Sequence, residues 1–316
     1  MSIDAVDKGC HMRIAVILVN YNGRQYNTAC IESLLAQKDS GGLYEMKIFV
    51  VDNASRDDSM QMIQERYGAD ERIETIFLDD NHGFSYANNV GIRRAGEWGA
   101  DYVLLLNNDT EAEEDMLAQL MACAGRHPDS MIAPKICYSD RRSVLWSAGG
   151  AVSPVIRKVR HIGLDQEDKG QFDQECQIGF ATGCCLLLPR DVIERAGFLD
   201  ERFFLYYEDT EYCFRLRKMG ISIWYCPKAR LYHKVGASSR GADSPLCAYY
   251  IARNWLLCSR QHLGGRYPLF VVYYVANRSA CCSLWLLKGK KELIRATGRG
   301  VRDYWAHRFG RSEYYQ

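Results

Sequence analysis

The sequence predicts an α/β fold, a doubly wound sheet with helices on both faces, followed by a helical extension at the C-terminal end. Between residues 13 and 136, four short apolar runs alternate with four stretches that place apolar residues at helical spacing. This pattern indicates buried parallel strands joined by helices. The chain of 316 residues is 47% hydrophobic and 25% charged, which is the composition of a globular protein.

The expected elements follow in order along the chain. Strands are expected at residues 14–19, 47–51, 73–78 and 102–106. Helices are expected at residues 25–37, 57–67, 84–95 and 113–126. A Gly-rich segment from about residue 137 has little periodicity and predicts a long excursion over the surface. Regular elements then return as a strand at 182–188, a helix at 208–219, strands at 221–225 and 229–233, and helices after Pro245.

The overall charge and the cysteines limit the function and the compartment. Lys and Arg number 40 against 39 Asp and Glu, so the chain has no global positive field, and no nucleic-acid partner is expected. The thirteen cysteines contain no C-x-x-C pair, and the first residues lack the pattern of a secretory signal. We therefore expect reduced thiols and a cytoplasmic location.

Three common nucleotide and metal motifs are absent from the sequence. The residues after the first strand, NYNGR at 20–24, are not the G-x-G-x-x-G of a dinucleotide-binding fold. The chain also contains no G-x-x-x-x-G-K-[ST] phosphate loop and no H-E-x-x-H helix. The sequence therefore lacks the motifs that would chiefly support hydride transfer, P-loop ATPase or zincin chemistry.

Amides and carboxylates follow each of the four apolar runs: NYN at 20–22, DN at 52–53, DDNHGF at 79–84 and NND at 107–109. In a doubly wound sheet the ligand site lies at the carboxyl ends of the strands, so these groups would line one edge. Each motif alone also suits a turn or a helix cap. Four of them on one sheet edge favour a binding site.

Together with later stretches, these motifs resemble the family 2 glycosyltransferases with a GT-A fold, in particular the rhamnosyltransferase-like branch. The similar stretches are VILVNYN at 16–22, VVDNASRDDS at 50–59, NHGFSYANNVGI at 81–92, LLLNNDT at 104–110, GFLDERFFLYYEDTEYCFRL at 197–216 and YHKVGAS at 232–238. The resemblance covers about residues 13–260. It implies a mixed sheet, with the chain divided into a tail at 1–12, a catalytic domain at 13–245 whose donor half ends near 136 and whose acceptor half follows from 137, and a helical, basic region at 246–316.

Such an enzyme moves a sugar from a nucleotide diphosphate sugar to a hydroxyl of a saccharide or of a polyprenyl-linked saccharide. The branch favours deoxythymidine diphosphate rhamnose as donor, with UDP and GDP sugars as alternatives. Asp52 would bond the base and Tyr21 would stack near it. By position in the motifs, the resemblance implies donor binding by Val19, Tyr21, Asp52, Gly83, Asn88 and Asn108. Turn geometry and helix capping are the alternative roles.

The resemblance also implies a divalent cation, Mg²⁺ or Mn²⁺, at Asp109 and His233. Asp109 is the last residue of the family's D-x-D motif, which here is NND, with an amide in place of the first carboxylate. Because both cations prefer oxygen ligands, the missing carboxylate predicts modest metal affinity. Alternatively, Asp109 caps the next helix and His233 is an ordinary hydrogen-bonded histidine.

The acid–base chemistry is assigned to Glu208 and Asp209, which match the family's ED pair. Asp209 would take the proton from the acceptor hydroxyl, with Glu208 as the next candidate. Acids at a helix N-terminus are also favoured by the helix dipole alone. A single base without a nucleophile predicts direct displacement with inversion. A non-catalytic sugar-nucleotide binder of the same fold and a sugar nucleotidyltransferase are the alternative functions.

The C-terminal region suggests contact with a membrane. Residues 269–287 are nearly long enough to span a bilayer, but Asn277 and Arg278 fall at their centre, where an arginine costs at least ~2.5 kcal/mol. Residues 288–316 hold eight Lys and Arg against three Asp and Glu. We expect residues 268–316 to lie on the anionic inner face of the cell membrane, or alternatively to pack on the catalytic domain.

Overall fold

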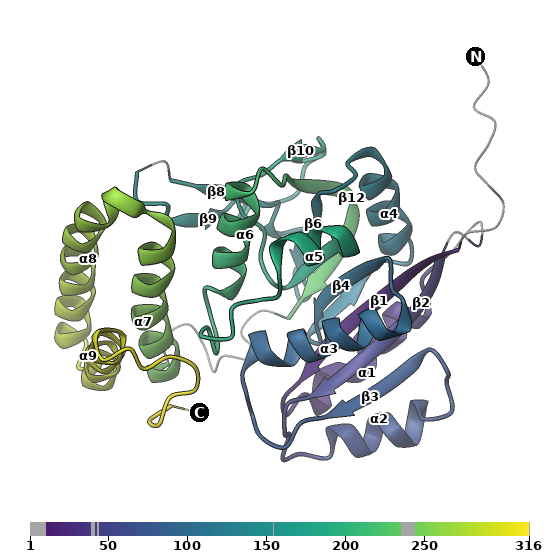
Figure 1. The fold of residues 1–316 in the computed structure, drawn as a ribbon, viewed down its shortest axis with the longest axis horizontal. Coiled ribbons are helices and arrows are strands. Elements are labelled where there is room, and N and C mark those ends of the chain that lie inside the picture. The colour runs from purple at the N-terminus through teal and green to yellow at the C-terminus, as the bar shows by residue number, and fades with distance from the viewer. Residues whose placement is uncertain (1–10, 39–41, 43, 154, 235–243, 316) are drawn as a thin grey trace.

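The computed structural model describes residues 11–38, 42, 44–153, 155–234 and 244–315. Residues 1–10 of the expected tail and 235–238 of the YHKVGAS stretch lie outside them. Within the described residues, the centre of the molecule is a sheet of ten strands with helices on both faces and a group of helices beyond one end (Figure 1). The predicted α/β class and the helical C-terminal region are both confirmed.

The first half of the sheet consists of parallel strands. In spatial order they are β3 (Ile73–Phe77), β2 (Tyr44–Asp52), β1 (Met12–Asn20) and β4 (Tyr102–Asn107). The helices of this half are α1 (Arg24–Leu35), α2 (Ser59–Tyr67), α3 (Phe84–Trp98) and α4 (Met116–Arg126), and the short β5 (Thr110–Ala112) precedes α4. All four predicted strands and helices are present, with shifted ends.

The second half makes the sheet mixed. β11 (Cys185–Pro189) is antiparallel to both β4 and β6 (Met131–Tyr138), and β6 is parallel to β12 (Ile223–His233). At the margin lie β7 (Leu145–Ser147) and β10 (Cys176–Gln177), while β8 (Gly150–Val152) and β9 (Val159–His161) form a separate pair. The helices here are α5 (Arg190–Ala196) and α6 (Glu208–Lys218).

Two expectations about this half are wrong. The strands expected at 221–225 and 229–233 are one strand, β12, whose register against β6 shifts between Cys226 and Arg230. Such an irregularity interrupts the alternation of side chains between the two faces of the sheet, but the strand continues through it. The excursion after residue 137 is not confined to the surface, because Ile178 and Phe180 from this segment are buried in the core.

β6 was not among the expected strands, because Lys135 interrupts its apolar run. The Lys135 side chain is fully buried, and its Nζ lies 3.0 Å from an oxygen of Asp168 and 2.5 Å from one of Asp173. A buried ammonium needs such partners, because desolvation disfavours an isolated charge. The two aspartates come from the excursion, so only the folded chain explains how this strand accommodates a lysine.

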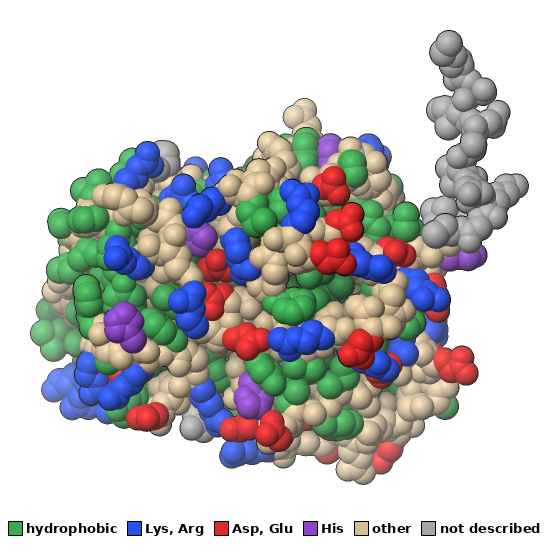
Figure 2. All heavy atoms as spheres, in the orientation of Figure 1, with side chains coloured by type: hydrophobic (Ala, Val, Ile, Leu, Met, Phe, Trp, Pro, Cys, Tyr) green, Lys and Arg blue, Asp and Glu red, His purple; other side chains and the backbone are tan. Residues whose placement is uncertain are grey.

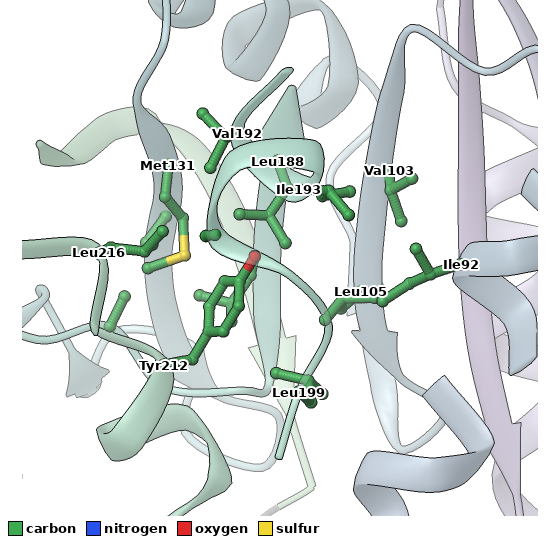
Figure 3. Close-up of a cluster of buried hydrophobic side chains, with 14 of the residues drawn as sticks. Ile92, Val103, Leu105, Met131, Leu188, Val192, Ile193, Leu199, Tyr212 and Leu216 are labelled. Atoms are coloured by element: carbon green, nitrogen blue, oxygen red, sulfur yellow. The ribbon is translucent and has the colours of Figure 1, made fainter. Parts of the chain in front are cut away.

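The two faces of the sheet bury two separate cores. Successive side chains of β1 point to opposite faces: Ile17 packs with α3, α5 and α6, whereas Val16 packs with α1, α2 and α4. Figure 3 shows the first core, where Tyr212 and Leu216 of α6 approach Met131 and Leu188 of the sheet. This packing fixes the start of α6, which carries Glu208 and Asp209, relative to the strand ends.

The C-terminal helices stand at one end of the sheet, beyond α6 (Figure 1). They are α7 (Pro245–His262), α8 (Tyr267–Leu287) and α9 (Lys291–Trp305), with a 3₁₀ turn at Gly264–Arg266. Trp255 of α7 and Phe270 of α8 share a buried cluster with Phe214 of α6. By length and composition, the continuous helical stretch Gly264–Leu287 could cross a membrane, and only 11% of its most apolar window is buried.

Candidate functional site

A buried network of amides surrounds Asp52 at the ends of β1, β2 and β4. Asn20 Nδ2 donates to Asp52 Oδ1 at 2.9 Å, and Asn27 Nδ2 donates to Asn20 Oδ1 at 2.8 Å. Asn108 Nδ2 in turn donates to Asn27 Oδ1 at 2.7 Å. The network therefore joins Asp52 and Asn108, two of the predicted site residues. Asn20 and Asn27 link them, and neither was among the predicted site residues.

Val19 and Tyr21 flank Asn20 at the end of β1. Val19 is half-buried and pairs in register with Asn107 of β4, whereas the Tyr21 side chain is 42% exposed. An exposed phenol ring at the rim of a buried polar network is available to stack on a planar ligand. Both residues therefore lie next to the network around Asp52.

The loop before α3 is held against the aromatic segment before α6. Phe84 N donates to Phe204 O at 2.8 Å. At Gly83, φ is +90°, and a Cβ atom there would lie 2.5 Å from Phe204 O, so only glycine fits. Asn88 is buried, and its Nδ2 donates to Phe84 O at 2.9 Å. The amide of Asn88 thus bonds its own helix, and its role in donor binding stays a prediction.

Asp109 and His233 meet in a buried aromatic environment. His233 Nε2 lies 3.2 Å from Asp109 Oδ1, and both side chains are buried. The Trp146 ring packs edge-on to His233, with centroids 4.5 Å apart, and also contacts His161 at 4.7 Å. Burial, reinforced by the charge of His233, lowers the pKa of His161 to about 4. His161 is therefore neutral at physiological pH.

Glu208 and Asp209 begin α6 and are held differently. Asp209 Oδ2 accepts from Gly183 N at 2.9 Å, and Asp209 Oδ1 accepts from Thr210 N at 2.6 Å. Glu208 is buried, and its Oε2 has no hydrogen-bond partner among the described residues. Burial, together with the neighbouring Asp209 charge, raises the pKa of Glu208 to about 8, and burial also raises the pKa of Asp209.

The raised pKa of Glu208 predicts a specific pH dependence of stability. Between about pH 4.5 and 8 the unfolded chain ionises Glu208 while the folded chain keeps its proton, so the free energy of unfolding falls as the pH rises. Glu208→Gln cannot ionise, and each unit of pKa difference is worth about 1.4 kcal/mol. We expect the variant to gain stability over the wild type at pH 9 relative to pH 5, as measured by urea unfolding. The exposed Glu194→Gln is the control, and equal pH profiles for wild type and Glu208→Gln would contradict the assignment.

The start of β11 connects the ED pair with the NND motif. Asn107 N donates to Cys184 O at 2.9 Å, and the adjacent Gly183 N donates to Asp209. A Cβ atom on Gly183 would lie 3.4 Å from Asp209 Cβ and 3.6 Å from a ring carbon of Phe84. Asp209 therefore lies next to the loop that carries Gly83. It is joined to the end of β4 through the hydrogen bonds of the adjacent residues Gly183 and Cys184.

The backbone before Glu208 is strained and braced by α7. Tyr206 and Tyr207 have φ values of +67° and +74°, which residues with a Cβ rarely adopt. The buried Asn254 of α7 holds this turn, because its Nδ2 donates to Leu205 O and to Tyr206 O, both at 2.9 Å. Strained backbone of this kind is found at functional sites and persists when its surroundings fix it.

The structure therefore groups the predicted residues at one edge of the sheet. Five residues that were not among the predicted site residues belong to the same region: Asn20, Asn27, Trp146, His161 and Asn254. For Asn20 the sequence did contain an indication of a role in the site, because this residue directly follows the first apolar run. Trp146 and His161 come from the segment without periodicity, and Asn254 lies in an apolar helix where nothing marks it.

Comparisons with known proteins identify the family and the fold of the chain. Residues 15–197 match the family model described as "Glycosyl transferase family 2". The low-salt glycan biosynthesis hexosyltransferase Agl10 of Haloferax volcanii is 29% identical, covering 78% of this chain and 75% of the relative. The dTDP-rhamnosyl transferase RfbF of Shigella flexneri is 24% identical, with 79% and 81% covered. The N-acetylglucosaminyl-diphospho-decaprenol L-rhamnosyltransferase of Mycobacterium tuberculosis is 26% identical, with 81% and 87% covered.

Solved structures show the same fold. The 1–349 fragment of S. aureus TarS in complex with UDP-GlcNAc superposes with a TM-score of 0.58 at 19% identity, covering 92% of this chain and 81% of that one. GalNAc-T7 with UDP, GalNAc and Mn²⁺ gives a TM-score of 0.59 at 14% identity, covering 78% and 48%. The chain has a GT-A fold and belongs to the family 2 glycosyltransferases, in the rhamnosyltransferase-like branch.

Proposed function

We propose that this glycosyltransferase moves rhamnose from deoxythymidine diphosphate rhamnose to a hydroxyl of a polyprenyl-linked saccharide, with inversion and with a divalent cation. The observation that carries the proposal is the hydrogen-bonded path from Asp209 through Gly183 and Cys184 to the end of β4. The carboxylate of Asp209, which we propose as the base, therefore lies near the strand end that precedes Asp109. The relatives named for rhamnosyl transfer support the choice of sugar.

The donor nucleotide would lie over the network around Asp52. The Asp52 carboxylate accepts from Asn20 and from Ser55 N at 3.1 Å, so it is held in one orientation and has lone pairs left for a donor group of the base. The exposed Tyr21 ring would cover the base, and the close approach of Gly83 to Phe204 would shape the wall beside it. Val19 and Asn108 would complete the floor of this half.

The residues at the end of β4 fit a divalent cation bound with the donor diphosphate. A buried carboxylate and an imidazole converge at Asp109 and His233, and this donor set suits Mn²⁺ or Mg²⁺ when phosphate oxygens supply further ligands. Such an ion stabilises the charge that grows on the leaving diphosphate. The neutral His161 adds no positive charge, and Trp146 excludes water from one side of His233.

The acceptor hydroxyl would approach from the side of α6. Asp209, held by Gly183 N and Thr210 N, would accept its proton as the oxygen attacks the anomeric carbon from the face opposite the diphosphate. No second carboxylate is needed as a nucleophile, so the configuration at that carbon inverts. Glu208 keeps its own proton and would leave Asp209 as the ionised member of the pair.

Product formation with defined substrates tests this function. The purified protein would be incubated with Mn²⁺, a polyprenyl-diphosphate-linked saccharide and each of dTDP-rhamnose, UDP-GlcNAc and a GDP sugar. We expect a product one deoxyhexose heavier with dTDP-rhamnose, and its anomeric configuration opposite to that of the donor. Donor binding without any product in the acceptor panel would favour the non-catalytic binder. Formation of dTDP-rhamnose from dTTP and rhamnose 1-phosphate would favour the nucleotidyltransferase.

Asn254 should control catalysis by positioning the turn before Glu208. In Asn254→Leu the carbonyl oxygens of Leu205 and Tyr206 lose their donor, and the strained turn loses its brace. A lost buried hydrogen bond costs ~1–3 kcal/mol, and we expect kcat to fall at least ~10-fold. Steady-state kinetics would show the loss in kcat, with the KM for the donor nearly unchanged. The matched control is Asn277→Leu on α8, and an unchanged kcat for Asn254→Leu would refute the positioning role.

We infer further that α8 rests on an anionic membrane surface. Its outward apolar side chains are between 56% and 85% exposed, and Figure 2 shows hydrophobic groups gathered at the end of the molecule where α8 lies. They are Leu269, Val272, Val275, Leu284, Leu286 and Leu287. Arg278 is the only charged residue between Arg266 and Lys288, and it lies 5.5 Å from the centre of the Trp255 ring on α7. The exposed face thus has no charge along its length.

Basic residues border this apolar face. Arg266 precedes α8, and Lys288 and Lys291 follow it, all exposed. Helices that lie in the membrane interface have an apolar strip that enters the lipid and cations at the ends of that strip. Each cation adds ~1 kcal/mol to the binding free energy on an anionic leaflet. A location at the inner face of the cell membrane would bring the site to a polyprenyl-linked acceptor.

Vesicle binding checks this location. We expect sedimentation with vesicles of phosphatidylglycerol and phosphatidylcholine, release in high salt, and at least tenfold weaker binding of the variant Val272→Glu, Leu286→Glu. The control is Phe77→Glu on β3, whose side chain is also more than half exposed. Absence of binding by the intact protein at low salt would contradict the proposal, and binding that survives high salt and alkaline extraction would indicate a spanning helix instead.

A further inference from the structure

Three side chains with metal-ligating atoms converge far from the strand ends that form the catalytic edge. Cys123 and His127 lie four residues apart on α4, so they share one face of the helix. Glu175 approaches them from the segment before β10. One ligating atom of each of the three lies within 4.8 Å of the other two. Neither the family motifs nor the proposed reaction uses any of them.

A fourth ligand stands beside this group. Cys226 of β12 is buried, and its Sγ donates to Gln119 O at 3.5 Å on the preceding turn of α4. The neighbouring Cys226 thiol, followed by burial, raises the pKa of the Cys123 thiol. Both cysteines are free rather than joined in a disulfide. Two thiols, an imidazole and a carboxylate from three separate segments therefore lie in one neighbourhood between α4, β12 and the segment before β10.

We propose that Cys123, His127, Glu175 and Cys226 bind one structural Zn²⁺ ion. Two thiolates and an imidazole are soft and intermediate ligands that select zinc over Mg²⁺ and Ca²⁺, and four ligands complete its tetrahedron. Both thiols lose their protons on binding. The ion with two thiolates and a carboxylate carries one net negative charge, which the guanidinium of Arg126 on Glu175 neutralises.

The surroundings already orient the ligands. The His127 ring stacks on Trp224 of β12, with centroids 3.5 Å apart and planes 9° from parallel. His127 Nε2 faces Glu175 Oε1 at 2.6 Å, and Arg126 Nε donates to the same oxygen at 3.1 Å. Zinc would take the place of the proton shared between the imidazole and the carboxylate. Hydrogen bonds from neighbouring residues to the ligands, such as the one from Arg126 to Glu175, usually orient the ligands of a metal site.

The ion would fasten α4 to the edge of the sheet. Cys226 lies near the start of β12 and His233 at its end, seven residues or roughly 20 Å along the strand. The zinc site is therefore separate from the donor cation at Asp109, and its loss should lower stability while leaving the catalytic groups in place. Zinc binding at this place does not depend on which sugar or acceptor the enzyme uses.

Metal analysis of the full chain tests the site. We expect about one zinc per chain after purification under reducing conditions, and replacement by Co²⁺ should give the thiolate-to-cobalt charge-transfer band and intense visible bands of a tetrahedral site. His127→Gln and Cys226→Ser should each weaken zinc binding at least tenfold. Adding zinc to the stripped wild type should raise its thermal midpoint by several degrees.

Matched variants distinguish zinc held by these four side chains from zinc held elsewhere on the chain. Cys137→Ser alters a buried cysteine of β6 outside the group, and Asp109→Ala removes the donor-cation ligand; both should keep their zinc. His127 is partly exposed, so His127→Gln tests the site even if Cys226→Ser fails to fold. Reduced wild-type protein without zinc or a cobalt–thiolate band would overturn the proposal, as would zinc retained at full affinity in His127→Gln and Cys226→Ser.

Discussion

Asp209→Asn is expected to lower the transfer rate by about 10²- to 10⁴-fold, the usual cost of losing a general base. The amide preserves the size of the side chain, and its oxygen can still accept from Gly183 N or Thr210 N. It cannot take the proton of the acceptor hydroxyl. Single-turnover kinetics should show the loss in the chemical step, while donor binding measured by calorimetry stays within about twofold of the wild type.

The pH profile and two variants identify the base. Burial raises the pKa of Asp209, so the wild-type rate should increase with pH until this carboxylate is ionised and then level off. Asp191→Asn in the first turn of α5 serves as the control, because this acid is exposed and remote from the acceptor side. If Asp209→Asn keeps more than about a tenth of the wild-type rate, the base is misassigned and Glu208→Gln becomes the decisive variant.

The positions of the proposed donor-binding residues were predictable because most of these residues directly follow or end predicted strands. A buried parallel strand is a continuous apolar run, so the place where the run ends is known. Asp52 is the last residue of β2, and Asp109 follows the end of β4 by two residues. The carboxyl ends of parallel strands share one edge, which brings Asp52 and Asn108 together. The amide network among them was not predictable, because it depends on the direction of each side chain.

The proposed acceptor half, after residue 136, was less predictable, because the arrangement of its elements depends on contacts between residues far apart in the sequence. β6 contains a lysine that only Asp168 and Asp173 make tolerable. The excursion after residue 137 has no periodicity, yet it supplies Trp146 and His161 around His233. In the sequence, Asn254 is one polar residue in an apolar helix. Its role is visible only in the structure, where its side chain bonds the strained turn at Tyr206. Positive φ values at two consecutive tyrosines have no sequence signal, because tyrosine has no preference for this conformation.

Asp109→Ala is expected to lower the transfer rate by at least about 100-fold, and removal of divalent cations should have a similar effect on the wild type. A carboxylate that helps to hold the donor cation supports several kcal/mol of charge stabilisation on the leaving diphosphate, and each 1.36 kcal/mol corresponds to a tenfold change in rate. His233→Ala should cost less, about tenfold, because an imidazole is a weaker partner for a hard cation.

Titration with metals distinguishes ligation from a structural role of Asp109. Rates would be measured after treatment with EDTA and after adding back Mg²⁺ or Mn²⁺, with Asp191→Ala as the control. We expect Mn²⁺ to restore the wild type fully, and His233→Ala to need a higher concentration of it, because a lost ligand raises the dissociation constant of the ion. Asp109→Ala should stay slow at every concentration. Full activity in excess EDTA would exclude the cation from the reaction, and Asp109 would then serve chiefly to hold His233, whose Nε2 faces its carboxylate beside the pairing of β5 with β12.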